Sequence, residues 1–61
     1  MKKKSKNIKV LIVEDDPDIS TLLSIRLVRD GYDVTSAQDG EEALLRLNDI
    51  KPNIVFLDLM L

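Results

Sequence analysis

Two short apolar segments, each followed at once by acidic residues, limit the folds open to this chain. The first, residues 8–13, is mostly a continuous run of apolar and β-branched side chains, and Glu14 and Asp15 follow it. The second, residues 54–57, is fully apolar, and Asp58 follows it. Short runs without alternation of apolar and polar residues are typical of strands covered on both faces, as in parallel sheets. The two segments are therefore predicted to be strands of an α/β fold.

Two amphipathic helices are predicted between these strands, separated by a third strand. Asp16 can cap the first helix, Pro17 fits its first position, and Gly31 is a natural left-handed stop after it. Asp39 caps the second helix, with Glu42 three residues later in a variant of the capping box. Apolar residues recur at helical spacing in both segments: Ile19, Leu22, Leu23 and Leu27 in the first, and Ala43, Leu44, Leu47 and Ile50 in the second.

The polarity of the middle strand decides between two strand orders. Residues 32–37 (YDVTSA) alternate in polarity, as a strand with an exposed side does, whereas the other two strands are apolar on both sides. The middle strand is therefore predicted at an edge, which gives the order 2-1-3 rather than 1-2-3. Because parallel crossovers are almost always right-handed, this order also places the helices on opposite faces. The predicted fold class is α/β, a parallel three-stranded sheet in the order 2-1-3 with one helix on each face.

Acidic residues follow the two strands that this order places side by side. In open α/β sheets, ligands bind beyond the carboxyl ends of the strands, where the strand order reverses. Glu14 and Asp15 leave one strand end, and Asp58 leaves its neighbour, about 5 Å away at backbone spacing. Carboxylates so close repel one another unless a cation is present. Mg²⁺ suits such a site, because it takes hard oxygen ligands and keeps waters that a phosphate can replace. We expect a Mg²⁺ and phosphoryl site centred on Asp58.

The composition excludes several other kinds of site. The chain has no cysteine and no histidine, which rules out disulfides, thiolate metal sites and histidine ligands. One Phe and one Tyr provide no platform for stacking bases, and no apolar run approaches the roughly 20 residues of a membrane span. Residues 1–7, rich in lysine, are interpreted as a basic, frayed N-terminal tail. We expect a cytoplasmic protein without membrane contact and without direct nucleic-acid contact from this segment.

At these positions the chain resembles the receiver domain of two-component response regulators. Three stretches carry the resemblance: residues 10–17 (VLIVEDDP), 39–43 (DGEEA) and 52–60 (PNIVFLDLM). It covers essentially all of residues 8–61, which would be about the N-terminal half (βαβαβ) of a typical receiver domain. The resemblance implies a truncated flavodoxin-like receiver fold.

The resemblance also implies a role for each acidic residue. Asp58 would be the phosphoacceptor, taking a phosphoryl group from a sensor histidine kinase or a phosphotransfer protein. Asp15 would bind Mg²⁺ directly, Glu14 would help to position it, often through water, and the backbone carbonyl of Met60 would be a further metal ligand. The Ser or Thr and the Lys that the family uses on later strands have no counterpart here. The activity expected is at most Mg²⁺-dependent self-phosphorylation from a phosphodonor, weak or absent, and not that of a stand-alone enzyme.

Three alternative interpretations remain to be weighed. A dissected or engineered half-domain that self-assembles without activity is compatible with the resemblance. A haloacid-dehalogenase-like phosphatase also places a nucleophilic Asp after an apolar strand, but it needs a second Asp two residues later, where Met60 stands. A dinucleotide-binding module needs a glycine-rich turn after the first strand, which this sequence lacks.

The third strand is expected to mediate self-association. In the order 2-1-3 it lies at an edge of the sheet, where its N–H and C=O groups lack a second neighbouring strand. Natural edge strands are protected by charges, proline or bulges, and residues 54–57 contain no charge and no proline. We expect two copies to pair through this strand in an antiparallel arrangement about a two-fold axis. A swapped or aggregated assembly and a largely disordered monomer are the alternatives.

Overall fold

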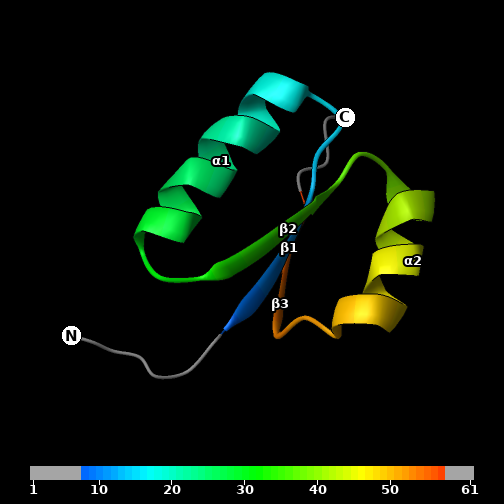
Figure 1. Ribbon diagram of the computed structural model, residues 1–61. Coiled ribbons are helices and arrows are strands. Elements are labelled where there is room, and N and C mark those ends of the chain that lie inside the picture. The colour runs from blue at the N-terminus through cyan, green and yellow to red at the C-terminus, as the bar shows by residue number, and fades with distance from the viewer. Residues whose placement is uncertain (1–7, 58–61) are drawn as a thin grey trace.

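The computed structural model describes residues 8–57 and shows five elements of secondary structure. In chain order they are β1 (Lys9–Val13), α1 (Pro17–Arg29), β2 (Asp33–Ala37), α2 (Gly40–Ile50) and β3 (Ile54–Leu57) (Figure 1). Each of the predicted strands and helices is present. The predicted N-terminal tail (residues 1–7), Asp58 and Met60 lie outside the described residues.

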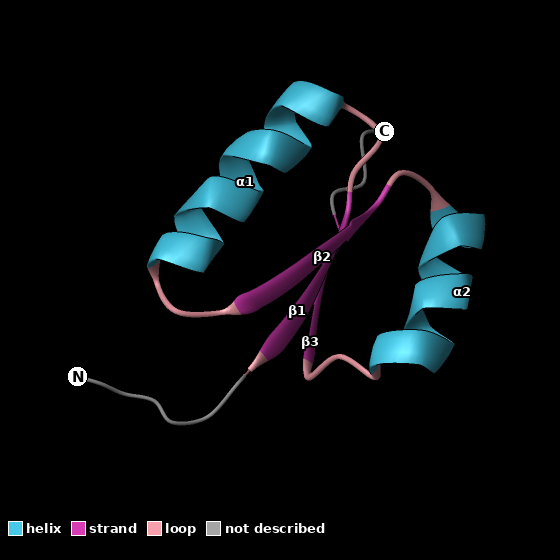
Figure 2. Cartoon of the chain, viewed as in Figure 1, coloured by secondary structure: helices cyan, strands magenta, loops and turns pink. Residues whose placement is uncertain are grey.

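The three strands form one parallel sheet in the order β2-β1-β3. The two helices lie on opposite sides of this sheet (Figure 2). The prediction of an α/β fold with strand order 2-1-3 and one helix on each face is therefore confirmed. This architecture agrees with the flavodoxin-like fold that the resemblance implies.

Strand β1 is the core of the molecule. Four consecutive residues, Val10 to Val13, are buried, and Leu11 and Ile12 have no exposed surface. Leu11 and Val13 form a cluster with Ala37 of β2, against which Ala43 and Ile50 of α2 pack. Because side chains alternate along a strand, Val10 and Ile12 point to the opposite face, which α1 covers. The continuous apolar run was correctly interpreted as a strand buried on both faces.

Both helices begin as the sequence predicts. The carboxylate of Asp16 accepts hydrogen bonds from the backbone N–H groups of Asp18 (2.9 Å) and Ile19 (3.3 Å) at the start of α1. At the start of α2, Asp39 accepts from the N–H of Glu42 at 2.9 Å. The Glu42 carboxylate reaches back to the N–H of Gln38 (2.9 Å), one residue before the cap, which completes a variant of the capping box.

The two helices end differently. After α1, Gly31 takes the left-handed conformation (φ 99°), and the N–H groups of Gly31 and Tyr32 donate to the carbonyls of Val28 and Leu27. This pair of bonds is the Schellman motif, which glycine favours. After α2, the left-handed position is held by Lys51 (φ 47°), whose positive charge complements the helix dipole. The sequence predicts the left-handed residue at the first of these stops, Gly31, but not the one at the second, Lys51.

Strand β3 is less buried than its apolar sequence alone indicates. Such a run is typical of a strand covered on both faces, but the four residues of β3 are between 44% and 55% exposed. The reason is that neither helix contacts β3, since both pack on β1 and β2. Several apolar side chains on the helices are exposed as well, contrary to the apolar face predicted for three of them, Leu22, Leu44 and Leu47. Among the described residues, the apolar side chains of β3 are therefore covered by neither helix.

Replacement of a β1 side chain should destabilise the fold far more than an equal change on a helix surface. Leu11→Ala removes a fully buried side chain and is expected to lower the free energy of unfolding by about 2–5 kcal/mol. Leu45→Ala makes the same change at a side chain that is 69% exposed, and its expected effect is within about 0.5 kcal/mol. Urea unfolding followed by far-UV circular dichroism measures both. Equal losses would contradict the placement of the core in β1.

Candidate functional site

Strands β1 and β3 are parallel neighbours, so they finish at the same end of the sheet. Acidic residues follow both strands in the sequence. In this pair Val13 is aligned with Leu57. Glu14 and Asp15 come directly after Val13, and Asp58 comes directly after Leu57. Asp58 lies outside the described residues, so its side chain has no place in the structure as described. The register nevertheless shows that Val13 and Leu57, the residues that precede the predicted acidic site residues on the two strands, are neighbours.

Asn53 fixes this register from the opposite end of the strands. Its backbone N–H donates to the carbonyl of Lys9 at 2.9 Å, and its side-chain Oδ1 accepts from the N–H of Lys9 at 2.8 Å. Both backbone groups of Lys9 are thus bonded to one residue. A one-residue slip would turn every β3 side chain to the other face of the sheet. The sequence analysis assigned Asn53 no role, and the signal available was its position between Pro52 and the apolar strand.

Glu14 is a buried carboxylate at the end of β1. It is 3% exposed, and its backbone N–H donates to the carbonyl of Ala37 at 3.0 Å, which ties the ends of β1 and β2 together. Its Oε2 atom accepts a hydrogen bond from the backbone N–H of Asp16 at 2.9 Å. Burial of a carboxylate is costly unless it is hydrogen-bonded or paired with a positive charge. Glu14 is therefore held in one orientation at the site that the sequence predicts.

Asp15 is exposed, although it is adjacent to Glu14 in the sequence. The chain leaves β1 here and enters α1 at Pro17, with the N-terminal end of that helix close by (Figure 1). A helix N-terminus carries a partial positive charge, which favours nearby anionic groups. The structure thus places one buried and one exposed carboxylate at the end of the same strand.

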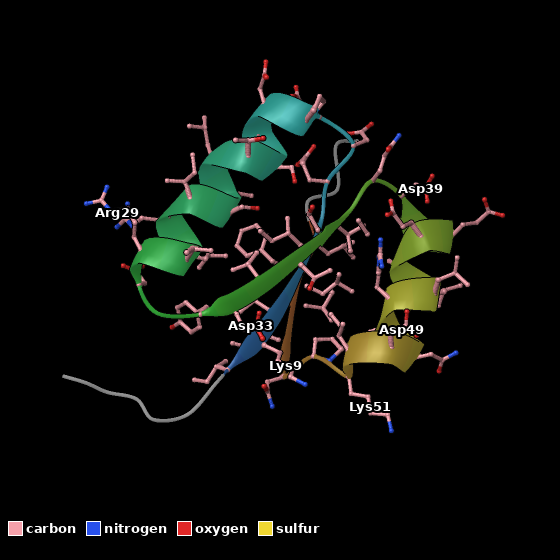
Figure 3. The ribbon with its side chains drawn as sticks, viewed as in Figure 1. Lys9, Arg29, Asp33, Asp39, Asp49 and Lys51 are labelled. Atoms are coloured by element: carbon pink, nitrogen blue, oxygen red, sulfur yellow. The ribbon has the colours of Figure 1, made fainter. Side chains whose placement is uncertain are left out.

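The remaining acidic residues of this edge serve the helices. Asp16 and Asp39 are N-caps, and Glu42 is engaged by Gln38 and by the guanidinium of Arg46, at 3.5 Å from Nη2 to Oε2. The expectation that caps account for Asp16 and Asp39 is confirmed. Asp33 and Asp49 lie at the opposite end of the sheet, with Lys9 and Lys51 nearby (Figure 3). Only Glu14 and Asp15, among the described acidic residues, follow a strand end next to β3.

A polar cavity of about 360 Å³ adjoins these two carboxylates. It lies on the side of β1 that faces β2, between the first turns of α1 and α2. The sequence analysis placed the site between β1 and β3, and it did not anticipate this space. The signal available in the sequence was the set of hydroxyl and amide side chains near the start of α1 and the end of β2, which are Ser20, Thr21, Ser36 and Gln38. The lining residues are Glu14, Asp15, Pro17, Ser20, Thr21, Ser36, Ala37, Gln38 and Glu42.

The donor atoms at the end of β1 fit Mg²⁺. Both are carboxylate oxygens, which are the hard ligands this ion prefers. Mg²⁺ usually takes only one or two carboxylates and keeps several waters, so an exposed acid beside a fixed, buried one is a suitable pair. Within residues 8–57 no three acidic side chains gather closely enough to hold a metal by themselves.

Comparison with known proteins identifies the family. The response regulator receiver domain pattern matches residues 10–61. The chain is 51% identical over 55 residues to the alkaline phosphatase synthesis transcriptional regulatory protein PhoP of Bacillus subtilis, covering 90% of this chain and 23% of that protein. It is 40% identical over 53 residues to the DNA-binding response regulator MtrA of Mycolicibacterium smegmatis (87% and 23%). It is 45% identical over 53 residues to the DNA-binding dual master transcriptional regulator RpaA of Synechocystis (87% and 22%).

The chain belongs to the response regulator receiver domain family. Such domains are phosphoacceptor modules of two-component signal transduction, they generally need Mg²⁺ for phosphorylation, and they interact with histidine kinases or phosphotransfer proteins. The resemblance expected from the sequence is confirmed. The chain spans 22–23% of the length of the three relatives named. Neither α1 nor α2, the helices of residues 8–57, has the length and apolar character needed to cross a lipid bilayer.

Two substitutions at Asp16 separate its capping role from its negative charge. Asp16→Ala removes the cap of α1 and is expected to lower the free energy of unfolding by about 1 kcal/mol. Asp16→Asn keeps an acceptor oxygen and should retain most of that stability, because Asn caps helices about as well as Asp. Thermal unfolding followed by circular dichroism measures the difference. A loss in Asp16→Asn as large as in Asp16→Ala would show that the charge, and not the cap, matters.

Proposed function

We propose that Asp58 of this chain accepts a phosphoryl group and that Asp15 and Glu14 hold the Mg²⁺ required for the transfer. The observation that carries the proposal is the alignment of Val13 with Leu57 in neighbouring parallel strands. The residues that follow this pair, Glu14 and Asp15 on one strand and Asp58 on the other, start from the same edge of the sheet. The family match over residues 10–61 supports the same assignment.

The proposed reaction is an in-line displacement at phosphorus. A carboxylate oxygen of Asp58 forms a bond to the phosphorus atom while the bond from phosphorus to a donor nitrogen of phosphohistidine breaks. The electron pair of the broken bond stays on the imidazole, and Asp58 becomes an acyl phosphate. Mg²⁺, when bound, supplies positive charge to the transferred oxygens. The carboxylates at the end of β1 have the complementary task of binding and orienting.

The two acidic residues that follow β1 differ in burial, which suggests different roles in binding and orienting the ion. Asp15 is exposed and is proposed as the direct metal ligand. Glu14 is buried, with Oε2 already bonded to the N–H of Asp16, and is proposed to position the ion, often through a water molecule. Asp58 and the backbone carbonyl of Met60 are proposed as the remaining protein ligands, on the strength of the family resemblance.

The proposed phosphodonor is a sensor histidine kinase or a phosphotransfer protein. This assignment rests on membership of the receiver family, and the identity of the kinase is not part of it. Of the relatives named above, PhoP and RpaA are named as transcriptional regulators, and the names of MtrA and RpaA state DNA binding for those proteins. No direct contact of the present segment with nucleic acid is proposed. A cytoplasmic location stays a prediction from the sequence.

Phosphorylation should depend on Asp58 alone. Acetyl phosphate with Mg²⁺ is expected to add at most one phosphoryl group, in low yield, detected by intact mass and by borohydride trapping of the acyl phosphate. Asp58→Asn should abolish the addition, because the amide is not a nucleophile. Asp33→Asn is the matched control, since it removes an exposed acid at the opposite end of the sheet, and it should be phosphorylated as the parent is. Labelling that survives Asp58→Asn would refute the assignment.

Mg²⁺ binding should depend on Asp15. Asp15→Asn is expected to weaken Mg²⁺ binding at least tenfold, because it replaces an exposed anionic ligand at the end of β1 with a neutral one. Asp33→Asn again serves as the control and should leave the affinity unchanged. Isothermal titration calorimetry gives both dissociation constants without any need for phosphorylation. An Asp15→Asn variant that binds Mg²⁺ as tightly as the parent would remove Asp15 from the metal site.

A further inference from the structure

The side chains of β3 do not by themselves specify its register on β1. The strand reads IVFL and presents two apolar residues on each face. A shift by one position along β1 would therefore exchange apolar side chains for apolar side chains on both faces. A hydrophobic pattern specifies register when the two faces of a strand differ in polarity, and those of β3 do not. The observed alignment, from Val10 with Ile54 to Val13 with Leu57, is therefore expected to depend on another interaction.

Asn53 provides such an interaction immediately before β3. Its N–H donates to the carbonyl of Lys9 at 2.9 Å, and its Oδ1 accepts from the N–H of Lys9 at 2.8 Å. In a regular parallel ladder, a residue that accepts from one residue of its neighbour donates to the residue two positions earlier. Lys9 would then donate to the carbonyl of Lys51, but Lys51 has the left-handed conformation (φ 47°) that ends α2. The Asn53 side chain thus takes the place of a strand carbonyl.

A change of this register would displace the segment that contains the proposed phosphoacceptor. Strands rise about 3.3 Å per residue, and successive side chains point to opposite faces. A slip of β3 by one position would move Leu57, and with it the start of the segment containing Asp58, by about 3.3 Å relative to Val13. Mg²⁺ requires near-ideal octahedral geometry, with ligands at about 2.0–2.1 Å. A displacement of this size is too large for the same oxygen atoms to bind one ion.

On the basis of the proposed function, we propose that Asn53 is a positioning residue of the Mg²⁺ and phosphoryl site. Its side chain holds β3 in the register that brings the residue before Asp58 beside the residue before Glu14 and Asp15. The four residues of β3, about 13 Å at strand spacing, separate Asn53 from that end of the sheet. Asn53 therefore acts on the ion through the register and not through contact.

The expected effect on affinity depends on the fraction of molecules in the observed register. Apparent affinity falls in proportion to the fraction of molecules that are competent to bind. Asn53→Ala removes the acceptor of the Lys9 N–H, and water can replace it because this bond is exposed. The observed register then loses its advantage over the alternatives. We expect Asn53→Ala to weaken Mg²⁺ binding at least threefold.

Two further variants of the full chain separate positioning from a simple loss of stability. Asn53→Asp keeps an acceptor oxygen for Lys9, and its Mg²⁺ affinity should stay within twofold of the parent. At about 0.1 M salt its added charge is largely screened over the length of β3, because the Debye length is about 10 Å. Gly31→Ala is the matched control, since it strains a left-handed residue (φ 99°) between α1 and β2 and leaves the β1–β3 pair intact. Its affinity should also stay within twofold.

Three measurements complete the test. Isothermal titration calorimetry gives the Mg²⁺ dissociation constants, and urea unfolding is expected to show that Gly31→Ala loses at least as much stability as Asn53→Ala. Cross-strand nuclear Overhauser effects that align Val13 with Leu57 should weaken in Asn53→Ala alone. The proposal is overturned if Asn53→Ala binds Mg²⁺ as the parent does, or no more weakly than Gly31→Ala or Asn53→Asp. Failure of the proposed function has a different signature, because Asp15→Asn would then bind Mg²⁺ as tightly as the parent.

Discussion

The structure depends on the complete enclosure of β1. A strand is paired with it on each side, and a helix covers each of its faces, so that Leu11 and Ile12 have no exposed surface. The four buried positions of this strand, Val10 to Val13, are all apolar. The first polar side chains that follow β1 in the sequence, Glu14 and Asp15, therefore lie at the carboxyl end of the strand, where the strand order reverses. The fold and the position of the acidic residues have one common cause.

Strand order and helix starts could be predicted from the sequence because they depend on local signals. Polarity along a strand reports how many of its faces are covered, which was enough to place β2 at the edge and β1 in the centre. Asp16 and Asp39 cap their helices through bonds to residues two or three positions away. The stop at Gly31 likewise needs no knowledge of the rest of the fold. Such short-range signals can be recognised in the sequence without knowledge of the tertiary packing.

Features that depend on distant parts of the chain could not be predicted in the same way. An apolar strand can be buried, but burial needs an element to cover it, and no described element covers β3. The bonds of Asn53 to Lys9 join residues 44 positions apart and depend on a register that polarity alone does not specify. The orientation of the Glu14 carboxylate depends on the turn into α1. The predicted position of Asp58 in the triad belongs to this group as well, and it stays a prediction because Asp58 lies outside the described residues.

The position of Asp16 joins the acidic site to the first turn of α1. Its N–H donates to Glu14 Oε2, while its own carboxylate accepts from the N–H groups of Asp18 and Ile19. These bonds run in series from the buried acid into the helix, and each one polarises the next. If Mg²⁺ binds beside Glu14 as proposed, its charge acts on a carboxylate whose Oε2 already accepts from the N–H of Asp16. The amide hydrogens of residues 16, 18 and 19 would then report that binding through their chemical shifts.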